Sequence, residues 1–235
     1  MSKHRTRPWI VAPHDPIEKL DDNVWAVQGS VPGLPHKRRM TIVKRADGTL
    51  LFYHAVPLRD DALAEVLAWG KPAYLVIAHD SHGIDAQPFR DRLGLKLFGP
   101  KSQVAKMRAK FDTDGALEDI PPDPAVTVEE VAGTKSDEPI VIARSGNGAR
   151  TSLAFCDAFQ NNDPAVTPWI LRMIGFTGPK VPPVFKLFFM RDKEALRAEF
   201  QTWAAIPGLA RLIPCHGAIV HSDAAGTLRR AAQAL

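Results

Sequence analysis

The feature that most restricts the fold of this chain is a change of pattern near residue 70, where alternating strand-like and helical segments begin. Ala73–Ala78 (AYLVIA) is a short continuous apolar run, which is typical of a central strand buried on both faces. Gln87–Leu93 and Ser102–Lys110 have helical patterns, and the strand-like Leu95–Phe98 lies between them. Strands that alternate with helices are typical of layered α/β proteins. We therefore predict an α/β (α+β) fold.

The first third of the chain is predicted to be mainly β-structure. Asn23–Gln28, Met40–Lys44 and Thr49–His54 are rich in residues that favour strands. The Asp47-Gly48 pair between the last two predicts a hairpin, because an Asp-Gly pair flanked by apolar runs suits a tight turn. Asp60–Gly70 then predicts a helix that Gly70 ends.

The second half contains two more predicted strands, Pro139–Ala143 and Ser152–Asp157, around the turn Arg144–Arg150. Glycine and asparagine in this turn suit the positive φ of a hairpin, and an anion-binding nest is the alternative. Asp192–Ala204 predicts a helix with Asp192 as its cap. Arg211–Pro214 predicts the last short strand, immediately before Cys215, His216 and Gly217.

Two stretches have no regular pattern. Gly115–Val128 is rich in proline and acidic residues, so we interpret it as a surface connection. Pro164–Met190 combines prolines with large apolar residues. It is either an irregular segment packed on the core, or an apolar flap or partner surface through which two copies of the chain form a homo-oligomer.

Length and composition indicate a single soluble domain spanning residues 1–235. A chain of 235 residues with 45% hydrophobic content suffices for one layered core. No apolar stretch approaches a membrane span, and no apolar segment follows the basic N-terminus, so we expect neither membrane insertion nor secretion. Two cysteines are too few for a disulfide framework, which fits a reducing compartment. We therefore expect a cytoplasmic protein.

The net charge of +4 comes largely from two basic clusters, Lys3–Arg7 and Lys37–Arg39. Neither has the interleaved aromatic residues of a nucleic-acid surface, so we expect no nucleic-acid partner. We interpret them as a solvated terminus and a solvated loop. The alternative is that Lys37–Arg39 attracts an acidic small-molecule substrate.

Four potential metal ligands follow three of the predicted strands. His79 and His82 come after YLVIA, Asp157 ends SLAFC, and His216 follows RLIP. Imidazole nitrogen and carboxylate oxygen are ligands of Zn²⁺, and such a set can lower the pKa of a bound water to near neutral. Each histidine alone is also compatible with a hydrogen-bonded structural role. The combination predicts a metal site.

The order of these segments resembles the metallo-β-lactamase superfamily, in particular an uncharacterised branch with a degenerate metal-binding motif. The resemblance spans roughly residues 20–222 and rests on Pro35–Val43 (PHKRRMTIV), Arg191–Leu196 (RDKEAL) and Arg211–Gly217 (RLIPCHG). It implies a four-layer αβ/βα sandwich with its site at one edge between two sheets. Residues 1–20 are then expected to form an extended N-terminal segment.

The resemblance also implies a reduced ligand set. The family loop His-x-His-x-Asp-His is matched by Ala78–Asp85, and two registers are open. In the preferred one, His79 takes the second histidine position, Ser81 replaces the aspartate and His82 takes the last position. The family's next histidine is missing, because none occurs in Arg144–Ser152.

This count predicts at most one tightly bound divalent metal, with Zn²⁺ as the first choice, or none. The implied ligands are His82, Asp157 and His216; Asp80 or Asp85 could add an oxygen. In the catalytic interpretation, Asp80 or His79 carries the proton. Cys156 and Cys215 flank two of these ligands and are interpreted as small core residues, with a metal-ligand or nucleophile role as the alternative.

Two functions follow from these expectations. The first is a metal-dependent hydrolase with one metal and a small-molecule substrate. The second is a catalytically inactive relative that binds a ligand or a protein partner.

Overall fold

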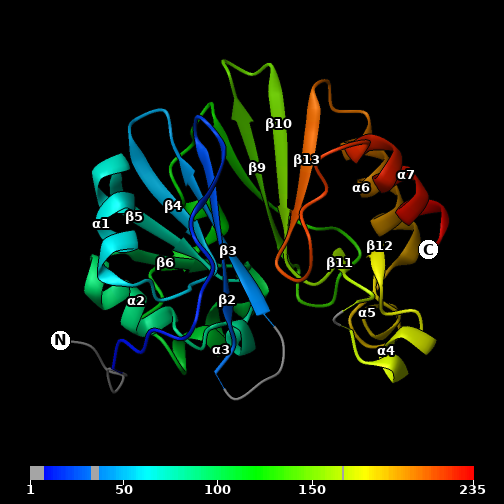
Figure 1. Ribbon diagram of the computed structural model, residues 1–235, viewed down its shortest axis with the longest axis horizontal. Helices are drawn as coiled ribbons and strands as arrows, with labels where there is room; N and C mark the ends of the chain where they lie inside the picture. Colours follow the sequence, from blue (N-terminus) through cyan, green and yellow to red (C-terminus); the bar gives the residue numbers. More distant parts are fainter. Residues whose placement is uncertain (1–7, 33–36, 166) are drawn as a thin grey trace.

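A computed structural model describes residues 8–32, 37–165 and 167–235. Two β-sheets face each other, with α1, α2 and α3 outside the first sheet and α6 and α7 outside the second (Figure 1). The chain is thus a four-layer sandwich. No helix in the described ranges is both long and apolar enough to cross a membrane.

The first sheet is antiparallel from β1 to β4 and parallel from β4 to β7. Its spatial order follows the chain: β1 (Glu18–Asp21), β2 (Val24–Ser30), β3 (Lys37–Lys44), β4 (Thr49–Tyr53), β5 (Lys71–Val76), β6 (Lys96–Gly99) and β7 (Gly115–Ala116). The helices on its outer side are α1 (Asp60–Trp69), α2 (Ala86–Leu93) and α3 (Val104–Arg108), and the 3-10 turns are η1 (Asp80–His82), η2 (Lys101–Gln103) and η3 (Leu117–Asp119).

The second sheet has the order β13-β10-β9-β8, and only the β10–β13 pair is parallel. Its strands are β8 (Val126–Glu130), β9 (Pro139–Ser145), β10 (Arg150–Phe155) and β13 (Leu209–Pro214). A small sheet pairs β11 (Gln160–Asn162) with β12 (Gly178–Lys180). The remaining helices are α4 (Trp169–Met173), α5 (Pro183–Phe188), α6 (Lys193–Ala204) and α7 (Ala224–Gln233).

Alternation along the strands divides the buried residues among three interlayer cores. In β2, Val24 and Ala26 pack between the two sheets, whereas Trp25 and Val27 pack under the helices of the first sheet. Successive strand residues point to opposite faces, so a strand covered on both sides is apolar throughout. The third core lies between the second sheet and the helices α6 and α7.

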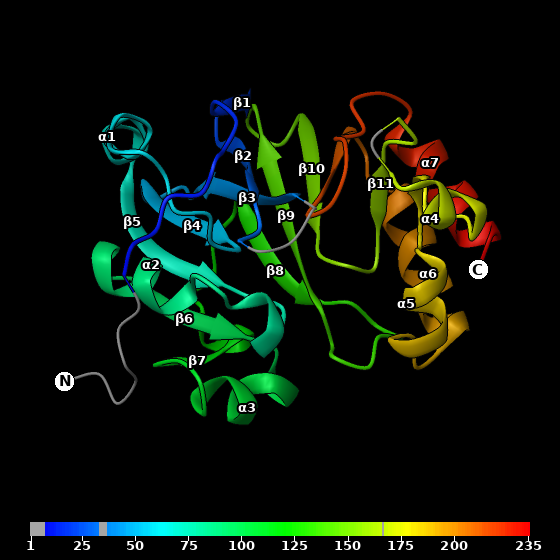
Figure 2. The same cartoon turned by 60° about the horizontal axis from the view of Figure 1, so that its bottom comes forward.

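The carboxyl ends of four strands meet at one edge of the sandwich. β4 and β5 run parallel in the first sheet, and β10 and β13 run parallel in the second. Figure 2 brings the bottom of Figure 1 forward and shows the two sheets facing each other across this region. Ligands of open α/β sheets bind at such carboxyl ends, so this edge is where a site is expected.

Several predicted elements need correction. The stretch Gly115–Val128 is not only a surface connection, because it contains β7, η3 and the start of β8. Pro164–Met190 contains α4, β12 and α5. The interpretation of Lys37–Arg39 as a solvated loop is wrong: these residues begin β3, and Arg38 and Arg39 are buried with polar partners. The Lys3–Arg7 cluster lies outside the described residues.

The carboxylate of Asp21 connects the two sheets at the end opposite the site. It accepts hydrogen bonds from Arg150 Nε at 2.9 Å and from Arg211 Nη1 at 2.9 Å. Hydrogen bonds from Arg150 above all, opposed by burial and assisted by Arg211, hold the pKa of Asp21 well below its usual range. A depressed native pKa stabilises the fold above the unfolded-state pKa, and this contribution is lost as the pH falls through the native value.

We therefore expect Asp21→Asn to lower the free energy of unfolding by about 2 kcal/mol at neutral pH, the magnitude of a charged hydrogen bond. The difference from wild type should shrink as the pH falls below about 4, where the carboxyl of unfolded wild type becomes protonated. Urea denaturation at neutral and acidic pH measures it. Asp60→Asn is the control, because Asp60 pairs with Arg92 while 89% exposed and exposed pairs contribute little. An equal loss in both variants contradicts the prediction.

Candidate metal centre

Eight side chains with metal-binding or acid–base chemistry converge where the four strands end. They come from the loops after β4, β5, β10 and β13 and from the residue before β9. The set comprises His54, His79, His82, Glu138, Cys156, Asp157, Cys215 and His216. Loops at strand ends carry functional groups on a rigid scaffold, and the four sequence-predicted ligands, His79, His82, Asp157 and His216, lie among these eight side chains.

His79, His82 and Asp157 form the first donor group. One ligand atom from each lies within 4.8 Å of the others. His82 Nε2 is 3.1 Å from Asp157 Oδ2, and the His79 and His82 ring centroids are 4.5 Å apart. Burial lowers the pKa of His79 to about 4, so its imidazole is neutral at neutral pH, as a metal ligand must be.

His216 is oriented toward this group by the backbone. Its Nδ1 lies 2.9 Å from the carbonyl oxygen of Lys37, to which a protonated Nδ1 donates, so Nε2 is the nitrogen that faces the other donors. Nε2 lies 3.5 Å from Asp157 Oδ1. Metal-binding histidines commonly have this second hydrogen bond to a carbonyl, because it fixes the ring and the tautomer.

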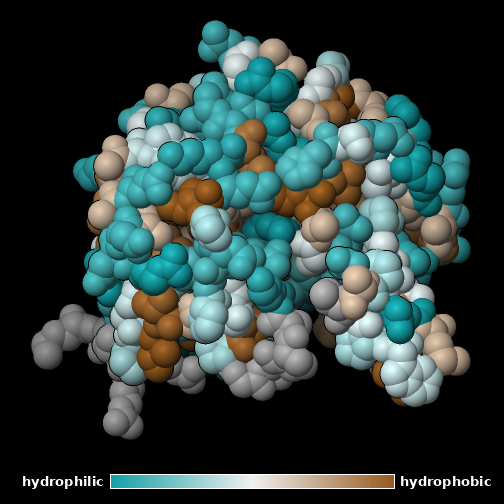
Figure 3. All heavy atoms as spheres, in the orientation of Figure 1, coloured by the Kyte–Doolittle hydropathy of each residue, from teal (hydrophilic) through white to brown (hydrophobic). Residues whose placement is uncertain are grey.

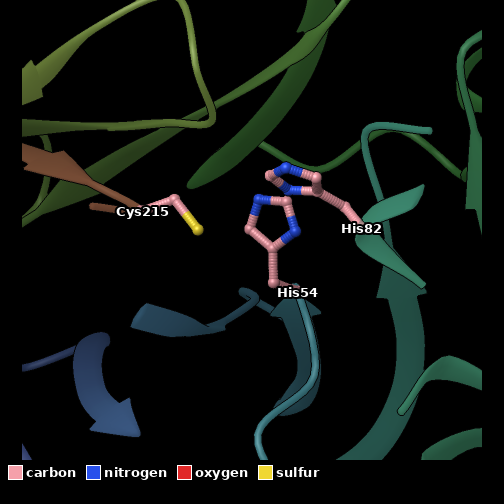
Figure 4. A group of neighbouring side chains, drawn as sticks. All are labelled: His54, His82 and Cys215. Carbon is pink, nitrogen blue, oxygen red and sulfur yellow. The ribbon is translucent and has the colours of Figure 1, made fainter. Parts of the chain in front are cut away.

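His54, His82 and Cys215 form a second donor group. Their ligand atoms also lie within 4.8 Å of one another. Figure 4 shows the Cys215 sulfur pointing toward the His54 ring, and the His82 ring approaches that ring from the other side. Among the described residues, the Cys215 thiol is the hydrogen-bond partner of the buried His54 ring, and at least one ring nitrogen has none.

Cys156 and Glu138 complete the surroundings of Asp157 and form a third donor group with it. Cys156 Sγ lies 3.2 Å from His82 Nδ1. Glu138 Oε2 accepts hydrogen bonds from the backbone nitrogens of Asp157 at 3.2 Å and of Ala158 at 2.9 Å. Burial, reinforced by the nearby charge of Asp157, raises the pKa of Glu138 to about 8. Glu138 therefore holds the backbone that presents Asp157.

The structure places two of the predicted oxygen donors in ion pairs instead. Asp85 is buried against the guanidinium of Arg38, and Asp80 lies 2.5 Å from Lys110 Nζ. Neither aspartate belongs to a donor group of the described residues. Asp80 remains beside His79, and its negative charge acts on that ring.

His54 and Glu138 are site residues that the sequence analysis missed. His54 follows the apolar run Thr49–Tyr53, which is the same signal that identified His79, but it was included in the predicted strand. Glu138 directly precedes the apolar run Pro139–Ala143. An ionisable residue at the boundary of a buried strand was therefore the available signal in both cases.

Comparison with known proteins identifies the fold. No protein-family model matches the sequence, and no curated protein matches it either. Among solved structures, the DIM-1 metallo-β-lactamase exposed to ceftazidime matches with a TM-score of 0.62 and 14% identity, covering 96% of this chain and 99% of that one.

Two further metallo-β-lactamases agree with this match. The enzyme from Hirschia baltica has a TM-score of 0.59 and 16% identity, over 93% of this chain and 98% of its own. The enzyme from Erythrobacter litoralis has a TM-score of 0.57 and 11% identity, over 93% and 92%. The chain has the metallo-β-lactamase fold, which confirms the predicted four-layer αβ/βα sandwich.

Proposed function

We propose that this chain is a metal-dependent hydrolase-like enzyme that binds one divalent cation through His79, His82 and Asp157. Zn²⁺ is the preferred metal in this proposal. The observation that carries the proposal is the mutual approach of these three donors within 4.8 Å, at the edge where the two sheets meet. Two imidazoles and a carboxylate fit the ligand chemistry of Zn²⁺ and leave room for a further ligand. His216, oriented by Lys37, completes the set on the far side of Asp157.

The surrounding residues have separable roles in this proposal. A bound cation supplies Lewis acidity toward an ester, amide or phosphoester oxygen. Asp157 would bind the cation between His82 and His216, whose Nε2 atoms lie 3.1 Å and 3.5 Å from its two carboxylate oxygens. Neutral His79 offers its lone pair to the cation, and Asp80 beside it is the group left to accept or return a proton. Backbone hydrogen bonds to Glu138 fix the position of Asp157.

The first test is the metal content of protein purified without a chelator. We expect a transition metal in the purified protein, or uptake of Zn²⁺ on soaking. Removing the metal should lower the thermal midpoint, because a ligand that binds only the native state stabilises it by mass action. Metal-dependent turnover of a panel of chromogenic esters and phosphodiesters then tests hydrolysis. Absence of any metal, with none taken up, would refute the proposal.

An exposed apolar surface favours the alternative, an inactive relative that binds a partner or a second copy of itself. The segment with α4 and α5 projects at the lower right of the molecule (Figure 3) and exposes large side chains. Trp169 is 64% exposed and Leu187 71% exposed. Under this alternative, chelation leaves the thermal midpoint unchanged, and His79→Ala alters neither stability nor partner binding.

A further inference from the structure

The metal-binding side chains at this edge of the sandwich differ in the chemical character of their donor atoms. His79 and Asp157 present nitrogen and oxygen, whereas the second donor group adds the sulfur of Cys215 to the imidazoles of His54 and His82. Sulfur ligands select thiophilic cations, and carboxylate oxygens favour harder ones. The two groups share only His82, whose neutral imidazole has a single lone pair, so they define two alternative cation positions.

We infer that His54, His82 and Cys215 form a second cation position, of thiolate–imidazole type, which takes a thiophilic divalent metal such as Zn²⁺, Co²⁺ or Cd²⁺. Imidazole nitrogen and thiolate sulfur are both ligands of Zn²⁺, and a site with three protein ligands keeps a fourth position open. This position deepens the proposed function but does not depend on hydrolysis, because its donors are separate from His79 and Asp157.

The buried imidazole of His54, with at most one of its two ring nitrogens paired, is the strongest argument for a ligand at this position. Its side chain is buried, and within the described ranges its ring has the Cys215 thiol as a hydrogen-bond partner, which leaves at least one ring nitrogen without one. Buried polar groups are satisfied in nearly all native structures, so an exception calls for a missing partner. A cation between His54 and Cys215 satisfies a ring nitrogen and the sulfur together (Figure 4).

The backbone holds His54 in a costly conformation that aims it at the cluster. Its φ is 64°, in the left-handed region that residues other than glycine rarely adopt. The His54 amide donates to the carbonyl of Val76 at 2.9 Å, which anchors this turn to the end of β5. Strained residues of this kind persist where the surroundings impose them, and they cluster at ligand sites.

Strand pairing also fixes the position of Cys215. β10 and β13 pair with Phe155 opposite Pro214, and the Cys215 amide donates to the carbonyl of Phe155 at 2.9 Å. Cys156 lies on the neighbouring strand, but its sulfur contacts His82 Nδ1 and it is absent from the group formed by His54 and Cys215. Substituting Cys215 is therefore expected to have a different effect on metal binding from substituting Cys156.

Titration of the metal-free full chain with Co²⁺ tests the inference, in a buffer that contains a phosphine rather than a thiol reductant. A thiolate bound to Co²⁺ gives a charge-transfer absorption in the near ultraviolet, which nitrogen and oxygen ligands do not give. We expect this band in the wild type. It should disappear in Cys215→Ala, persist in Cys156→Ala and Asp157→Asn, and require at least about tenfold more Co²⁺ in His54→Ala.

A measurement on the wild type alone guards against variants that fail to fold. X-ray absorption of the Zn²⁺-loaded protein should show a sulfur ligand at about 2.3 Å. Bound metal without a sulfur ligand or a charge-transfer band would overturn the inference and leave the proposed function standing. Loss of the band in Cys156→Ala but not in Cys215→Ala would also overturn it. A band that persists in Asp157→Asn, in a protein without hydrolytic activity, supports the inference and counts against the proposed function.

Discussion

Replacing His82 with alanine is expected to abolish tight metal binding altogether, because His82 is the one residue common to the two histidine-containing donor groups. Removing an outer partner of a metal ligand typically costs 10–100-fold in affinity. We therefore expect the loss of this shared ligand to exceed about 100-fold. His79→Ala or Cys215→Ala should each impair only one position.

Thermal unfolding with and without Zn²⁺ measures this effect. When the free metal is at about 1,000 times its Kd, the wild type should gain about 4 kcal/mol of stability by mass action. The His82→Ala variant should gain almost nothing. His221→Ala is the matched control, since His221 is an exposed histidine whose only recorded partner in the described part of the chain is Glu18 at 3.7 Å. Undiminished metal-dependent stabilisation of His82→Ala contradicts both assigned cation positions.

The layers of the fold could be predicted from the sequence because periodicity reports burial directly. The run Ala73–Ala78 is apolar throughout, and the structure buries its second part, residues 75–78, between the helices of the first sheet and the second sheet. The cap of α6 was also readable: Asp192 accepts from the backbone nitrogens of Glu194 and Ala195, as predicted. Local signals of this kind depend only on residues close in sequence.

The division of the site between two donor groups could not be predicted in the same way, because it depends on which loops meet. The sequence indicated His82, Asp157 and His216 as one ligand set, whereas the structure groups His82 and Asp157 with His79. The position of η1 decides this, since it turns His79 and His82 toward the same carboxylate. No spacing rule within one loop contains that information.

Charge was the least informative signal. Arg38 and Arg39 look like part of a solvated basic loop in the sequence, yet each is matched by partners that are far away along the chain. Arg38 pairs with Asp85, which removes that aspartate from the candidate ligands. A buried charge is stable only where such partners meet it, and the partners become visible only in the folded chain.

Arg39 has the larger structural consequence, and its replacement by methionine is expected to weaken both the fold and the metal centre. Its Nη1 donates to the carbonyls of Pro214 at 2.7 Å and Gly217 at 2.8 Å, and its Nη2 donates to Gln28 Oε1 at 2.6 Å. The two bonds from Nη1 connect β3 of the first sheet to the loop that carries Cys215 and His216, and the bond from Nη2 stays within the first sheet. Methionine keeps the apolar stem but leaves the two carbonyls without this donor.

The expected cost of Arg39→Met is about 3 kcal/mol, since a hydrogen bond to a charged group contributes about 1.5–3 kcal/mol. For a chain of this size the thermal midpoint should then fall by roughly 10 °C. Zn²⁺ affinity should fall about 10–100-fold, as when an outer-shell partner of a metal ligand is removed. Isothermal titration and thermal unfolding measure the two effects.

Lys37→Met on the same strand separates the role of Arg39 from a general loss of positive charge. Lys37 pairs with Asp15 at 2.9 Å while 48% exposed, so its side chain should contribute less than about 1 kcal/mol. Its backbone carbonyl, which orients His216, is unchanged by the substitution. If Arg39→Met lowers stability but leaves Zn²⁺ affinity equal to that of Lys37→Met, the loop keeps its ligands in place without Arg39. If both properties fall only in Arg39→Met, the same two hydrogen bonds from Arg39 Nη1 that join the two sheets also position the metal centre between them.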